Sequence, residues 1–165
     1  MGQSPDSSTY NTEKIGIPLI QGNADITNRK SNPRQYTSKP TKLCEVGDIL
    51  LTVRAPVGYV AKSTHKACIG RGICVLRNKE NSNMEFLYQF LLSFENSWKS
   101  LEQGSTFTAV NGIDIELINV SLPTIAEQNK IAKFLTCIDT KIGIENKLIK
   151  KMEEHKKFFL ANLFI

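Results

Sequence analysis

The sequence predicts a fold of the α+β class, a mixed globular domain followed by a long C-terminal helix of the coiled-coil type. Short apolar or β-branched stretches separated by proline and glycine fill the first part of the chain, which is typical of strands joined by turns. A segment with helical spacing of aromatic and aliphatic residues follows. After Pro123 there is no further proline, and apolar residues repeat with 4-3 spacing. We therefore expect two units, residues 1–123 and residues 124–165.

Within the first unit, apolar stretches bounded by turn residues predict strands over residues 17–20, 48–53, 57–61, 73–76 and 118–122. Helical spacing over residues 82–101 predicts a buried amphipathic helix, opened by a capping box of Ser82 and Glu85. Its aromatic residues are expected to lie in the core rather than to stack on bases. Residues 103–111 are small and polar, and we expect them to form a loop.

The C-terminal segment is predicted to be one helix, opened by a second capping box of Thr124 and Glu127. About 38 helical residues would extend roughly 57 Å, too far for this domain to cover one face. The apolar stripe therefore needs a partner helix, although a helix folded back on its own domain is the alternative. Glu145 and Lys156 are polar positions of the stripe, and Gly143 is expected to weaken its middle. The apolar members are Ile131, Leu135, Ile138, Ile142, Ile149, Met152, Phe159 and Leu163.

Positive charge is concentrated in one part of the chain. Residues 29–77 contain ten basic and two acidic residues, so this segment has a net charge of +8 while the whole chain has +5. Such segregation favours a polyanionic partner. The alternative is a solvated lysine-rich surface.

Several functional classes lack support in the sequence. The four cysteines and two histidines show no metal-ligand spacing, so we expect reduced core thiols, no metal and no cofactor. No apolar run is long enough to span a membrane, and residues 2–12 are too polar for a secretory signal. We therefore expect a cytoplasmic protein. A P-loop and an adenine-methyltransferase motif are both missing, so no catalytic residue is predicted.

Four segments follow one another in a characteristic order. The first joins Gly2-Gln3-Ser4-Pro5 to residues 16–23, and the second joins residues 45–50 to residues 54–58. The third is Ile69-Gly70-Arg71-Gly72, and the fourth joins residues 104–106 to residues 122–132. Over nearly the whole chain, the ordered set resembles the target-recognition domain and spacer helix of type I restriction–modification specificity subunits.

This resemblance implies a non-catalytic subunit that binds double-stranded DNA and directs adenine methylation and restriction by partner modification and restriction subunits. A complete subunit of this family has two recognition domains, separated by two antiparallel helices. The sequence here has one recognition domain and one helix. Met1 directly precedes the Gly-x-Ser-Pro motif, which in family members usually follows a short strand-like segment. We therefore expect residues 1–123 to be a DNA target-recognition domain within a half-subunit or a fragment. The alternative functions are a protein–protein scaffold that docks through its coiled coil and a catalytic nuclease or methyltransferase domain.

Candidate DNA-contacting residues come from the basic segment and from polar loops. Basic side chains suit phosphates and guanine, and amide side chains suit adenine. The basic candidates are expected to lie largely on one face; they are Arg29, Lys30, Arg34, Arg54, Lys62 and Arg71. The loop candidates are Gln3, Ser4, Asn23, Gln35, Tyr36, Ser105 and Thr106. The apolar stripe predicts a homodimer through residues 125–163, with a monomer awaiting a different partner helix as the alternative.

Overall fold

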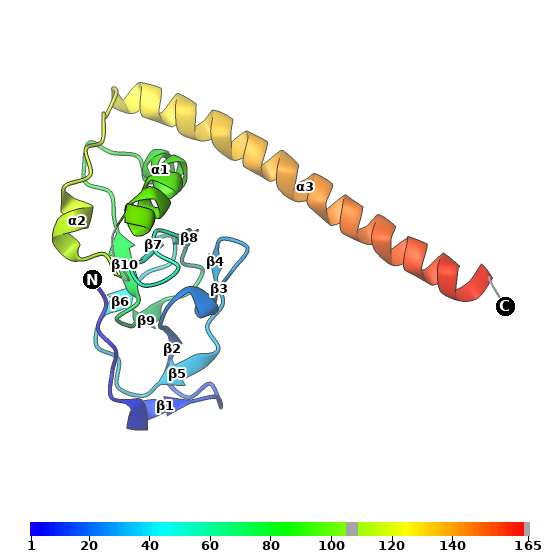
Figure 1. The fold of residues 1–165 in the computed structure, drawn as a ribbon, viewed down its shortest axis with the longest axis horizontal. Helices are drawn as coiled ribbons and strands as arrows, with labels where there is room; N and C mark the ends of the chain where they lie inside the picture. Colours follow the sequence, from blue (N-terminus) through cyan, green and yellow to red (C-terminus); the bar gives the residue numbers. More distant parts are fainter. Residues whose placement is uncertain (105–108, 164–165) are drawn as a thin grey trace.

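Two five-stranded sheets form the centre of this computed structural model, which describes residues 1–104 and 109–163 (Figure 1). The first sheet has the order β1 (Tyr10–Asn11), β5 (Gln35–Thr37), β2 (Ile17–Ile20), β9 (Ala67–Ile69) and β6 (Leu43–Cys44). The second has the order β10 (Ile73–Leu76), β7 (Ile49–Thr52), β8 (Val60–Lys62), β4 (Lys30–Ser31) and β3 (Ile26–Thr27). The pairs β2–β9 and β4–β8 are parallel and the others are antiparallel.

Strand β7 lies between two apolar layers, because successive side chains of a strand point to opposite faces. Ile49 and Leu51 pack in a cluster with residues of α1 (Met84–Gly104), including Leu91 and Trp98. Leu50 packs in a second cluster with residues of the first sheet, among them Ile20. The fold therefore has α1 on one side of the second sheet and the first sheet on the other.

The helix α3 (Ile125–Leu163) leaves this body as a single rod of 39 residues, about 58 Å long at the usual helical rise (Figure 1). Its capping box is present, since Glu127 accepts the Thr124 N–H and Thr124 Oγ1 accepts the Glu127 N–H. Gln128 and Ala132 are buried where the first turns pack against α1. The apolar stripe itself is exposed or half-buried, so the alternative of a helix folded back on its own domain applies only at the base of α3.

The amide of Gln128 attaches α3 to the body. Its oxygen accepts the Asn83 N–H at 2.8 Å, and its nitrogen donates to the carbonyls of Asn81 and Pro123 at 3.2 and 2.8 Å. A buried amide with both ends paired fixes the position of the helix base more tightly than apolar contact alone.

The predicted α+β class and the long C-terminal helix are confirmed, and the strands 17–20 and 73–76 are found with the predicted bounds. Some local predictions were wrong. The strand expected at 57–61 is β8 at Val60–Lys62, because the Gly58 and Tyr59 N–H groups instead bond to the carbonyl and hydroxyl of Thr52 in a turn. The predicted cap Ser82 bonds to Lys79, and Asn83 accepts the Phe86 N–H at the start of α1.

The region before α3 also differs from the sequence prediction. No strand forms over residues 118–122, which are irregular. The loop expected over 103–111 is in part helical, because α1 continues to Gly104. Beyond it, the short helix α2 (Gly112–Glu116) forms because Asn111 and Asp114 make a reciprocal capping box.

We predict that Gly58→Ala lowers the free energy of unfolding by about 2–4 kcal/mol, as a sum of backbone strain and overpacking. Gly58 has a φ of +81°, and an added Cβ would overlap the Trp98 side chain. Gly47→Ala is the matched control, because Gly47 has a φ of +91° with open space around it. Urea denaturation followed by Trp98 fluorescence measures both, and equal losses for the two variants would contradict the packing argument.

Candidate nucleic-acid interface

The N-terminal segment lies against the turn that connects the two sheets. The N–H groups of Gly2 and Gln3 donate to the carbonyls of Ile73 and Ile69, at 2.8 and 2.9 Å. The Ser4 hydroxyl accepts the Arg71 N–H at 3.1 Å. The Gly-x-Ser-Pro and Gly-Arg-Gly motifs, separated by more than sixty residues in sequence, therefore form one local structure.

Glycine at position 72 lets this turn approach strand β2. The Gly72 N–H donates to the Gln21 carbonyl at 3.1 Å, and a Cβ on Gly72 would overlap that oxygen. The Gly70 N–H donates to the Ile20 carbonyl at 2.8 Å. Arg71, whose side chain is exposed, thus lies in a turn whose backbone contacts Gln21.

A buried carboxylate lies below the same surface. Asp25 is in the short helix η2 (Asn23–Asp25), and its Oδ2 accepts the Gln21 N–H at 2.8 Å. Its Oδ1 accepts Arg34 Nε at 2.9 Å. The Asp25 side chain is 5% exposed, while that of Arg34 is 65% exposed. The ion pair therefore fixes the base of the guanidinium and leaves its outer end in solvent.

Gln21 contacts both Asp25, the partner of Arg34, and Gln35, the residue that follows Arg34. Gln21 Nε2 donates to Gln35 Oε1 at 3.3 Å, and both side chains are half-buried. We call the resulting surface the glutamine–arginine patch; it comprises Ser4, Gln21, Arg34, Gln35 and Arg71. Four of these residues were predicted from the sequence as DNA-contacting candidates, and the structure brings them together.

Arg29 belongs to a different cluster, at the junction of β8 and α1. Its guanidinium forms a bidentate ion pair with Glu95 and donates to the Val60 carbonyl at 2.9 Å. It also lies 4.4 Å above the Tyr59 ring centroid. Glu95 accepts the Val60 N–H at 2.7 Å, and its hydrogen bond raises the pKa of Arg29 above the ordinary value. The guanidinium is thus occupied by contacts within the protein.

Lys62 is engaged in the same way nearly three turns earlier along α1, since its partner Glu85 precedes Glu95 by ten residues. Its ammonium pairs with Glu85 and lies 4.3 Å from the Tyr88 ring centroid. Burial raises the pKa of Tyr88 to about 12. The contacts of Arg29 and Lys62 therefore attach β8 and its neighbour β4 to α1.

The other candidates are dispersed. Lys30 lies in β4 opposite Lys62, and Arg54 is exposed at a bridge to Ala109. Tyr36 lies in β5 opposite Pro18 and Asn11. Gln3 is exposed beside the patch and Asn23 is half-buried in η2, whereas Ser105 and Thr106 lie outside the described residues.

Acidic side chains that lie close in space neutralise part of the positive charge that is concentrated in residues 29–77. Arg29, Arg34 and Lys62 pair with acids that lie outside residues 29–77, namely Glu95, Asp25 and Glu85. Lys66 and Arg77 pair with Glu45 and Asp48 inside that segment. Lys30, Arg54 and Arg71 have no ion-pair partner among residues 1–98 and 109–163. These three exposed cations are therefore available for an anionic ligand.

Gln21, Asp25 and Glu95 are not among the residues predicted from the sequence. Asp25 and Glu95 are separated from Arg34 and Arg29 by 9 and 66 residues, and no local spacing rule joins such pairs. Gln21 lay inside the recognised segment 16–23, but its role depends on a contact with the distant turn at Gly72.

Other kinds of site find no support in the described part of the chain. Its histidines, cysteines and acids form no group of three able to hold a metal ion. Burial raises the pKa of the Cys44 and Cys74 thiols, which lowers their thiolate content and hence their reactivity. Among the described helices, none has the length and apolar character needed to cross a membrane.

A model of the type I restriction modification DNA specificity domain matches residues 1–154. The chain belongs to this family. The putative type I restriction enzyme MjaX specificity subunit of Methanocaldococcus jannaschii is 42% identical over 158 residues, covering 95% of this chain and 37% of that protein.

Two solved structures agree in fold and sequence. A chain from a structure described for complex assembly and conformational transition of the type I R-M system has a TM-score of 0.82 and 34% identity, covering 96% of this chain and 40% of that one. The HsdS subunit from Thermoanaerobacter tengcongensis has a TM-score of 0.77 and 34% identity, covering 90% of this chain and 36% of that one. The chain therefore spans well under half the length of these relatives.

We predict that Glu95→Gln lowers the free energy of unfolding by about 1–3 kcal/mol, because Arg29 loses the charge that compensates its partial burial. The side chains of Glu95 and Arg29 are 14% and 37% exposed. Glu45→Gln is the control, since Glu45 and Lys66 are both more than half exposed and such pairs contribute at most about 1 kcal/mol. Chemical denaturation compares the two, and a larger loss for Glu45→Gln would refute the structural role of Arg29.

Proposed function

We propose that this chain recognises a DNA sequence and directs adenine methylation and restriction by partner subunits, without catalysing either reaction. The observation that supports this most directly is membership of the DNA specificity domain family over residues 1–154. In this proposal residues 1–123 form the DNA target-recognition domain and residues 124–165 form the spacer and dimerisation segment.

The exposed cations suit the phosphate part of this task. Lys30, Arg54 and Arg71 have no acid beside them among the described residues, so no internal ion pair must break when they meet phosphate. Contacts of this kind position a protein on the duplex, and they release counterions whatever the sequence. Arg29 and Lys62 remain candidates, but DNA would have to compete with Glu95 and Glu85 for them.

The glutamine–arginine patch suits the sequence-reading part. Amide and guanidinium groups match the hydrogen-bonding edges of adenine and guanine in the major groove. We propose that Gln3, Ser4, Asn23 and Tyr36 contribute contacts at the margin of this patch. For Ser105 and Thr106 a contact with the DNA backbone is proposed from their place in the family motif alone.

We predict that replacing Lys30, Arg54 and Arg71 together by alanine weakens binding to every duplex and reduces the salt slope by about one unit per lost phosphate contact. The matched control replaces Lys147, Lys150 and Lys151, three exposed lysines of α3, and thus removes the same charge far from the recognition domain. Fluorescence anisotropy over a salt series measures both variants.

This measurement also separates the proposal from its alternative. The long helix with little domain contact would equally suit a protein scaffold that docks through α3 and contacts no DNA. A wild-type chain that shows no salt-dependent binding to duplex DNA would favour the scaffold.

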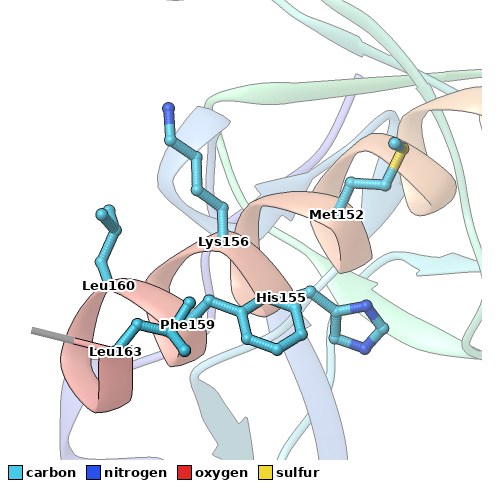
Figure 2. A pocket seen from close by; sticks show the side chains of 6 residues that line it. All are labelled: Met152, His155, Lys156, Phe159, Leu160 and Leu163. Atoms are coloured by element: carbon cyan, nitrogen blue, oxygen red, sulfur yellow. The ribbon is translucent and has the colours of Figure 1, made fainter.

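For assembly, we propose an antiparallel homodimer through α3. Ile138, Ile142, Ile149 and Phe159 are exposed along one stripe of the helix. Near its C-terminus, Met152, Phe159 and Leu163 belong to the stripe and help to line an open apolar hollow (Figure 2). The relatives are more than twice as long as this chain, and a second copy would supply a second helix and a second recognition domain. Two-fold symmetry would then make the two DNA half-sites inverted copies of each other.

We predict that Ile142→Glu converts a dimer to a monomer, because a charge would then lie within the apolar interface. Ile144→Glu is the matched control; Ile142 and Ile144 are 52% and 61% exposed on the same helix, but only Ile142 belongs to the stripe. Sedimentation equilibrium at micromolar concentration decides the question. A wild-type monomer that remains monomeric after Glu145→Leu would rule out self-pairing and favour a different partner helix.

A further inference from the structure

We propose that Arg34 contacts a guanine edge in the major groove and that Asp25, buried behind it, positions its guanidinium for this contact. The inference rests on the proposed DNA-recognition function and names the residue and the base. It starts from the three arginines that pair with acids of low exposure, namely Arg29, Arg34 and Arg77.

These three pairs differ in which nitrogens they use. Arg29 uses both terminal nitrogens on Glu95, and Arg77 uses Nε and one terminal nitrogen on Asp48. Arg34 uses Nε alone, and its two terminal nitrogens have no hydrogen-bond partner within the described ranges. Those two nitrogens form the outer edge of the guanidinium, which is the edge that binds O6 and N7 of guanine in a bidentate contact.

Asp25 is itself held in place, so that it can orient Arg34. Its side chain accepts the Gln21 N–H at 2.8 Å, its N–H donates to the Gly22 carbonyl at 3.0 Å, and its carbonyl accepts the Asn32 N–H at 2.7 Å. An arginine oriented before binding loses less conformational entropy when it meets its target.

The neighbouring amides favour a base contact over a phosphate contact. Gln35 accepts a hydrogen bond from Gln21 through Oε1, which leaves its NH₂ group and a second lone pair for a partner. An amide offers a donor and an acceptor side by side, which matches N7 and N6 of adenine but is not required by a phosphate. The exposed cations Lys30 and Arg54, which lie outside the patch, are the candidates for phosphate contacts elsewhere on the domain.

The test is selection of preferred sites by the full 165-residue chain from a randomised duplex library, followed by affinity measurements on single-base variants of the selected site. We expect Arg34→Ala to lose preference for guanine at one position of each half-site by about 5- to 150-fold, the range for one bidentate base contact. Preference at the other positions is expected to remain.

Two further variants distinguish positioning from a general effect on the fold. Arg34→Lys keeps the charge but lacks the planar fork, so it is not expected to restore the guanine preference. Asp25→Asn is expected to reduce preference at the same position as Arg34→Ala and at no other. Should Asp25→Asn fail to fold, the two Arg34 variants, whose changes are mostly at exposed atoms, still decide the guanine contact.

The control is Arg77→Ala, which removes an exposed arginine paired with a buried aspartate outside the patch; the selected sequence is expected to stay unchanged. An unaltered sequence preference in Arg34→Ala would overturn the inference, and so would uniform weakening on all sequences, which would assign Arg34 to a phosphate. In both cases duplex binding by the wild-type chain would leave the proposed function standing. If the wild-type chain bound no duplex or selected no sequence, the proposed function and this inference would both fall.

Discussion

The close backbone approach at the turn from Gly70 to Gly72 is the constraint on which the two sheets and the candidate interface depend. This turn carries the chain from β9 of the first sheet to β10 of the second, and it bonds to Ile20 at the end of β2 and to the following residue, Gln21. The N-terminal segment closes over it through Gly2, Gln3 and Ser4. A side chain at position 72 would force Gln21 away, and Gln21 is the residue that connects Asp25 to Gln35. Packing of the fold and geometry of the patch are therefore set at the same place.

Ion pairs within the protein lower the net positive charge that the basic segment, residues 29–77, presents to a ligand. Counted along the sequence, it has few acids, but in space Asp25, Glu85 and Glu95 approach it. Arg29 and Lys62 consequently join β8 and β4 to α1 rather than presenting free charge. The outward field is weaker than the local +8 suggests, and specificity has to come from a few oriented groups more than from total charge.

The features that could be predicted from the sequence are those that depend on local pattern. The apolar runs of β2, β7 and β10, the helical spacing of α1 and the long repeat of α3 are all visible in single segments. Strands of two or three residues, such as β1, β3 and β6, carry too little pattern and exist because distant partners bond to them. The same limit applies to the patch: four of its residues were candidates, but Gln21 and the neighbouring Asp25 acquire their roles only through contacts formed on folding. The short helix α2 was missed although its cap, Asn111-x-x-Asp114, is local.

The attachment of α3 has a mechanical consequence. A rod about 58 Å long that is fixed near one end acts as a lever, so a rotation of about 5° at its base moves its far end by roughly 5 Å. That displacement is close to one helical turn. The stiffness of the joint at Gln128, where one amide bonds to Asn83, Asn81 and Pro123, thus determines how accurately the distant end of the helix is aimed. Weakening this joint would broaden the set of directions in which the rod points while leaving every residue of the rod unchanged.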